Sequence, residues 1–68
     1  MLSEYEIVFA KRDLDDCVSK GTKGVVLIIL RPGLYEVEFV DERNDTVGLL
    51  EVKEEDVVTE YPVEEIRN

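Results

Sequence analysis

The segment around a proline–glycine pair constrains the fold more than any other part of this sequence. Residues 25–30 are consecutive aliphatic residues, and residues 34–40, after Pro32-Gly33, alternate apolar side chains with glutamates. Proline presets the backbone angle φ at the first central position of a turn, and glycine supplies the positive φ that a type II turn needs next. The sequence therefore predicts a β-hairpin. Its first strand is apolar on both faces, and its second strand has one buried face.

A first strand and an irregular loop are predicted ahead of this hairpin. The beginning of the chain alternates like a strand with one buried face, and we expect Tyr5, Ile7 and Phe9 to point inward. Residues 11–20 contain aspartates that disfavour a strand. Leu14 is expected either on a single helical turn or on a loop that tucks it under the sheet, and the sequence leaves both alternatives open.

Two more strands and a helical turn are predicted after the hairpin. Residues 46–52 read as a fourth strand in which Gly48 marks a bulge or a sharp bend. The polar stretch 53–56 suits one turn of helix, and residues 57–61 read as a short closing strand.

This order of elements predicts an all-β fold, a small five-stranded SH3-like barrel or roll with one short helical turn before the last strand. An OB-fold also has five strands, but it usually carries a helix between the third and the fourth, where this sequence has only the turn at residues 41–45. We expect a single domain over residues 1–61 and a C-terminal tail over residues 62–68.

Four segments of this sequence carry a resemblance to a known family. They are residues 20–26, residues 35–41, residues 46–50 and residues 54–57. Together they resemble the small bacterial family catalogued as domain of unknown function 4926, whose members look like stand-alone intracellular proteins with an SH3-like barrel. No activity is established for that family, so the resemblance transfers no catalytic residue. The sequence departs from the family pattern at Asn44-Asp45, where related sequences often carry glycine, and at Cys17.

Length and cysteine content predict a cytoplasmic protein. The 68 residues contain one cysteine, Cys17, whereas small secreted domains usually depend on several disulfides. The beginning of the chain lacks the basic and apolar regions of a signal peptide. The longest apolar run, residues 25–30, is far shorter than the roughly 20 residues that a membrane helix needs.

The net charge of −9 lies entirely in the second half of the chain. Residues 1–34 contain five acids and five bases, whereas residues 35–68 contain twelve acids and three bases. The negative electrostatic field of this half repels the phosphate backbone of nucleic acids and attracts basic proteins. The sequence therefore argues against nucleic acid as a partner. A basic protein partner is one explanation of the acidity, and simple solubility is the other.

No residue pattern indicates a reaction, a metal or a cofactor. Histidine, the commonest general base, is absent. Asp13, Asp15 and Asp16 resemble the start of a calcium-binding loop, but the glycine and glutamate that such a loop needs further on are missing. A chain this short leaves little volume for an enclosed substrate pocket. We therefore expect a non-enzymatic protein with no catalytic, metal or cofactor site and no small-molecule substrate.

The aliphatic run predicts the surface that meets a partner. One alternate set of its side chains must line the core, and the other set needs cover from the barrel itself or from another chain. The predicted interface consists of Val26, Ile28, Leu30, Glu36 and Glu38. The function that we expect is an accessory or adaptor module that binds a protein partner or a second copy of itself. The alternative is an antitoxin or immunity-type protein that neutralises a basic partner.

Overall fold

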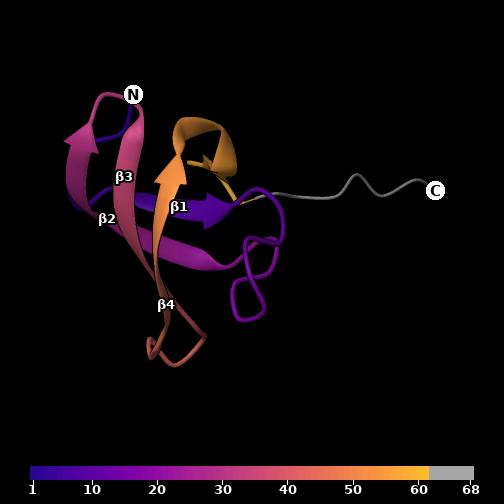
Figure 1. Cartoon of the computed structure of the whole chain (residues 1–68). Helices are drawn as coiled ribbons and strands as arrows, with labels where there is room; N and C mark the ends of the chain where they lie inside the picture. The colour runs from indigo at the N-terminus through magenta and orange to yellow at the C-terminus, as the bar shows by residue number, and fades with distance from the viewer. Residues whose placement is uncertain (62–68) are drawn as a thin grey trace.

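The computed structural model describes residues 1–61 as five antiparallel strands in one strongly curled sheet, an SH3-like half-barrel (Figure 1). The elements are β1 (Ile7–Ala10), β2 (Lys23–Arg31), β3 (Leu34–Val40), β4 (Thr46–Lys53), the 3-10 turn η1 (Glu54–Asp56) and β5 (Val57–Val58). Neighbours across the sheet follow the order β4-β3-β2-β1-β5. The predicted fold class is confirmed, including the helical turn before the last strand. The predicted tail, residues 62–68, lies outside the described residues.

The hairpin of β2 and β3 forms around Pro32-Gly33 as the sequence predicts. Gly33 has a φ of 83°, in the left-handed region that glycine adopts without steric cost. The carbonyl oxygen of Gly33 accepts a hydrogen bond of 3.2 Å from the backbone N–H of Glu54. This bond continues the ladder between β3 and β4 beyond the pair Leu34–Lys53 and ties the tip of the hairpin to η1.

The core lies on the inner side of the sheet and is centred on β3. Tyr35, Val37 and Phe39 are completely buried, as their alternation with glutamates predicts. The other buried side chains of this core are Leu2, Val8, Ala10, Val18, Val26, Val52 and Val57. No polar or charged side chain is buried within residues 1–61, so hydrophobic burial dominates the stability of the domain.

The prediction for the inward face of β1 is wrong. Val8 is completely buried, whereas Ile7 is exposed, Phe9 is half-buried and Tyr5 lies outside the strand on the surface. Val8 pairs with Gly24 on β2, which in turn pairs with a core residue of β3. Because alternation separates two faces without saying which one is covered, only this register decides which face of β1 points inward.

The segment between β1 and β2 is a loop, which confirms one of the two alternatives for Leu14. The backbone N–H of Leu14 donates to the carbonyl oxygen of Val18 at 2.8 Å. The Oδ1 atom of Asp15 accepts backbone hydrogen bonds from Cys17 and Val18 at 2.8 and 2.9 Å. Val18 is thereby held in the core, and Leu14 packs against the core.

Strand β2 does not present two regular faces. Its pairing with β3 shifts register at Leu27 and again at Leu30, each of which has no residue opposite it. A bulge of this kind bends the strand and increases its twist. Consequently neither alternate set of the aliphatic run lines the core as a whole: Val26 is completely buried, but Ile28 is exposed.

Candidate functional site

The five residues predicted as a partner interface do not share one surface. Ile28, Glu36 and Glu38 lie on the outer side of the sheet. Val26 lies in the core, so it cannot contact a partner, and its place in the predicted interface is corrected. Leu30 lies at the far end of β2 and is exposed. The bulges of β2 explain the separation, because they break the alternation on which the prediction depended.

The first row of outer side chains joins Ile28 to two carboxylates. Ile28 on β2 is opposite Glu36 on β3, which is opposite Glu51 on β4. Directly opposite residues of antiparallel strands point to the same face, with Cβ atoms about 4.5–5.5 Å apart. Glu36 and Glu51 are therefore neighbouring like charges, an arrangement that destabilises a sheet unless a cation lies nearby.

A second row runs parallel to the first and is mainly aliphatic. Ile7, Val25, Glu38 and Leu49 are opposite one another on β1, β2, β3 and β4. Ile7 is 40% exposed and Leu49 is 56% exposed. We call the two rows together the outer face: Ile7, Val25, Ile28, Glu36, Glu38, Leu49 and Glu51.

The carboxylates of the outer face have no cationic partner among the described residues. Within residues 1–61, Met1 forms an ion pair with Glu54 and Arg12 forms one with Asp56, and neither pair includes a carboxylate of the outer face. Glu38 accepts a hydrogen bond from the Thr46 hydroxyl. The outer face therefore combines exposed aliphatic side chains with negative charge that the described part of the chain does not neutralise.

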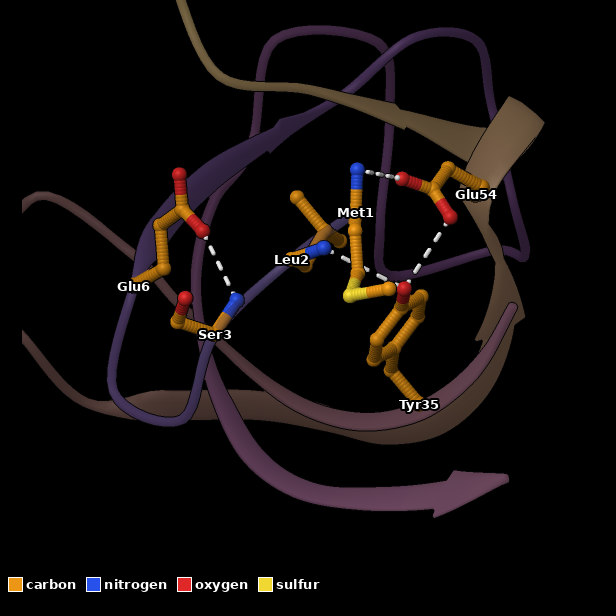
Figure 2. Close-up of polar contacts among 6 residues, drawn as sticks. All are labelled: Met1, Leu2, Ser3, Glu6, Tyr35 and Glu54. Atoms are coloured by element: carbon orange, nitrogen blue, oxygen red, sulfur yellow. Dashed lines mark hydrogen bonds and ion pairs between the residues drawn. The ribbon is translucent and has the colours of Figure 1, made fainter. Parts of the chain in front are cut away.

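A second polar cluster lies at the N-terminus on the inner side, and we call it the N-terminal latch: Met1, Leu2, Tyr35 and Glu54 (Figure 2). The hydroxyl of Tyr35 accepts a 3.2 Å hydrogen bond from the backbone N–H of Leu2 and donates at 3.0 Å to Oε1 of Glu54. The Met1 ammonium lies 2.7 Å from Oε2 of Glu54. These contacts hold the chain end against the buried ring of Tyr35.

The N-terminal latch moves two pKa values in opposite directions. The hydrogen bond from the Met1 ammonium, followed by that from Tyr35, lowers the pKa of Glu54 below its ordinary value of 4.5. The hydrogen bond and the charge of Glu54 raise the pKa of the Met1 amine above its ordinary value of 8.0. The contribution of Glu54 to stability is lost as pH falls through its lowered pKa, and that of the amine is lost as pH rises through its raised pKa.

We therefore expect Glu54→Gln to reduce the free energy of unfolding most between pH 4.5 and pH 8.0. The difference from the wild-type chain should shrink on both sides of that window, because the unmodified pair then loses one of its charges. Urea unfolding at a series of pH values measures it. Glu55→Gln, a neighbouring exposed position on η1, is the matched control. A difference that stays constant from acid to alkaline pH would contradict this role of Glu54.

An open cleft of about 730 Å³ lies at the end of the sheet formed by the turn at residues 41–45. Phe9 and Tyr61 form part of its wall, and their rings are arranged edge to face with centroids 5.4 Å apart. Lys23 and Asp41 are among the residues that line it. Because the cleft is open and carries both signs of charge, it offers no preference for one class of ligand.

Within residues 1–61 no group of three or more histidine, cysteine, aspartate or glutamate side chains is arranged to hold a metal ion. No helix in this part of the chain has the length and hydropathy of a membrane span. Cys17 is a free, exposed thiol in the loop before β2.

The fold and the outer face define a small SH3-like half-barrel domain with an acidic and aliphatic sheet surface. Residues 4–59 match the family described as Domain of unknown function (DUF4926), and the chain belongs to this family. Comparison with curated proteins and with solved structures gives no match.

Four members of the outer face were missed by the sequence prediction: Ile7, Val25, Leu49 and Glu51. The sequence contains a signal for Leu49 and Glu51 on β4, because these residues alternate with Leu50 and Val52, which point inward. Ile7 was missed because the sequence prediction placed its side of β1 in the core. No signal in the sequence pairs Glu51 with Glu36, since that requires the register of β3 against β4.

Proposed function

We propose that this chain is a non-enzymatic accessory or adaptor module that binds a basic protein through the outer face. The observation that carries the proposal is the row in which Glu36 and Glu51 lie side by side next to exposed Ile28, with no ion pair to a cation within residues 1–61. A lysine or arginine from a partner would relieve their repulsion, and the aliphatic side chains would be covered by the same contact.

The net charge of −9 favours a basic protein over nucleic acid. A field of this sign repels phosphates and accelerates encounters with cationic surfaces. Lys23 and Lys53 lie at strand ends on the outer side, and neither forms an ion pair with the outer face in the described structure. The compartment that we propose is the cytoplasm, where an exposed thiol such as Cys17 stays reduced.

The same surface also supports the narrower proposal of an antitoxin or immunity-type protein, in which the basic partner is a toxin. The observation that favours it is the concentration of carboxylates on one open face of a very small domain. Co-expression with the product of a neighbouring gene separates the two proposals. Relief of that product's toxicity by this chain supports an antitoxin, and a harmless neighbour removes that proposal.

Charge reversal on the outer face tests the interaction proposal. The purified chain, immobilised and exposed to extract of its native host, should retain basic proteins, and the variant Glu36→Lys/Glu51→Lys should retain about tenfold less of them, equivalent to about 1.4 kcal/mol of binding free energy. The matched control is Glu42→Lys/Asp45→Lys, which makes the same change of charge in the exposed turn at residues 41–45. Equal loss in both variants would show a general effect of charge and would contradict the proposed site.

A further inference from the structure

The geometry points to a strand-addition site on the free edge of β2: we propose that residues 27–30 accept an extended segment of a basic protein partner as a sixth strand. The inference rests on the proposed function and adds to it the way in which the partner is held. Extended peptides join exposed sheet edges through main-chain hydrogen bonds, and side-chain pockets add specificity.

Beyond Val26, the side of β2 that faces β1 has no partner strand among the described residues. The ladder between β1 and β2 ends at the pair Ile7–Val25. Val26 makes the last two bonds on that side, donating to the carbonyl oxygen of Glu6 at 3.0 Å and accepting from the N–H of Tyr5 at 2.6 Å. No backbone hydrogen bond outside the ladder with β3 involves residues 27–30 within the described chain.

The edge is open because the preceding chain turns away from it. Tyr5 has a φ of 66°, which belongs to a turn closed by the hydrogen bond from the N–H of Glu6 to the carbonyl oxygen of Ser3 at 3.1 Å. Ahead of this turn, Leu2 enters the core and bonds to Tyr35 (Figure 2). The N-terminal segment therefore cannot continue β1 alongside β2, and the bulge at Leu27 bends β2 as well.

Apart from its bulges at Leu27 and Leu30, the free edge lacks the charges and the proline that commonly protect a strand edge. Ile28, Ile29 and Leu30 are 46%, 42% and 42% exposed, and residues 27–30 contain neither a charge nor a proline. Proteins commonly block such an edge with lysine, proline or a covering segment, since a long exposed aliphatic edge is a template for pairing. An edge that is left aliphatic is suited to a partner strand.

Charge complementarity selects a basic occupant over a second copy of this chain. Glu36 lies directly opposite Ile28, and Glu4 and Glu6 flank the turn at Tyr5 where the free edge begins. An added strand would lie among these carboxylates. A second copy would bring another net charge of −9 to the same place, which electrostatic repulsion opposes. The segment that fits alternates aliphatic and basic residues, because successive side chains of a strand point to opposite faces.

Hydrogen exchange with defined peptides tests this site. The first probe is an extended heptapeptide that alternates lysine and valine, and the second is its glutamate–valine counterpart. Two further lysine–valine peptides are methylated at alternate backbone amides, one at the lysines and the other at the valines. With the full chain labelled with nitrogen-15, the lysine–valine peptide should slow exchange of unpaired amides in residues 27–30 by about tenfold or more at saturation. The glutamate–valine peptide should not slow this exchange. One of the two methylated peptides should also fail to slow it, because its methyl groups replace the N–H donors that face β2.

A variant pair separates the edge from charge in general. Ile29→Lys should abolish the protection by placing a positive charge on the edge, whereas Thr59→Lys, an exposed position after β5, should preserve it.

Three outcomes would overturn the strand-addition site. The first is binding that shifts only signals of the outer face, or binding that is equally strong for both methylated peptides. Either result leaves the proposed function intact and shows that no strand is added. Protection without peptide that rises with protein concentration, together with a doubled mass in sedimentation, assigns the edge to a second copy. Absence of saturable binding by the lysine–valine peptide at millimolar concentration also refutes the site, and the proposed function is then decided by the charge-reversal variants alone.

Discussion

Tyr35→Ala is expected to lower the free energy of unfolding by about 3–5 kcal/mol, the range for removal of a fully buried aromatic side chain. A domain of 68 residues has a total stability of roughly 3–10 kcal/mol. The substitution should therefore unfold much or all of the protein. Two losses combine in it: the ring leaves a cavity beside Val52, its partner on β4, and the hydroxyl no longer binds Leu2 and Glu54.

Tyr35→Phe separates these two losses, because it keeps the ring and removes only the hydroxyl. We expect it to cost about 1–2 kcal/mol, the value for a buried donor left without its acceptor, here the N–H of Leu2. Urea unfolding followed by circular dichroism measures both variants. Equal stability of Tyr35→Phe and the wild-type chain would show that the N-terminal latch contributes nothing beyond packing of the ring.

Gly24→Ala is expected to lower the free energy of unfolding by about 1–3 kcal/mol through overpacking. A Cβ atom at Gly24 would lie 2.7 Å from Cγ1 of Val37 and 2.8 Å from Cδ1 of Phe39. Both neighbours are completely buried, so neither can move into solvent to relieve the clash. Gly24 and Phe39 are directly opposite each other, and Gly48 is the partner of Phe39 on β4, so the ring lies between two strands that lack side chains there.

A double-mutant cycle tests the cause of this loss. Phe39→Leu removes the ring that supplies two of the three atoms nearest to the added Cβ, while Cγ1 of Val37 stays in place. The pair Gly24→Ala/Phe39→Leu should therefore lose less stability than the sum of the single substitutions. Ala10→Gly, at a buried position of β1, serves as a control for backbone flexibility without a clash. Additive losses would mean that the cost of Gly24→Ala does not come from contact with Phe39.

Both predictions concern the side of the sheet opposite to the outer face, which matters for reading binding data. Tyr35 and Gly24 are buried, so their variants affect partner binding through the stability of the fold. Glu36→Lys/Glu51→Lys instead changes exposed or half-buried side chains. Stability measurements on each variant therefore precede any conclusion about the interface.

The alternation of β3 was sufficient to predict its bounds and its buried face from the sequence. Tyr35, Val37 and Phe39 alternate with glutamates, and a charge on one side of a strand leaves no doubt about which side faces water. The turn at Pro32-Gly33 and the helical turn before β5 were predictable for a similarly local reason, since they depend on the backbone preferences of two to four adjacent residues.

The sequence by itself determined the order of the five strands, the all-β class and the place where negative charge accumulates, because each depends on neighbouring residues or on composition. Only the tertiary structure decided which side of β1 is covered, where β2 bulges, and that Glu51 lies beside Glu36. These features depend on register between strands far apart in the chain. An aliphatic run without charges is compatible with several registers, and packing of Phe39 against Gly24 selects among them through contacts that no local pattern encodes.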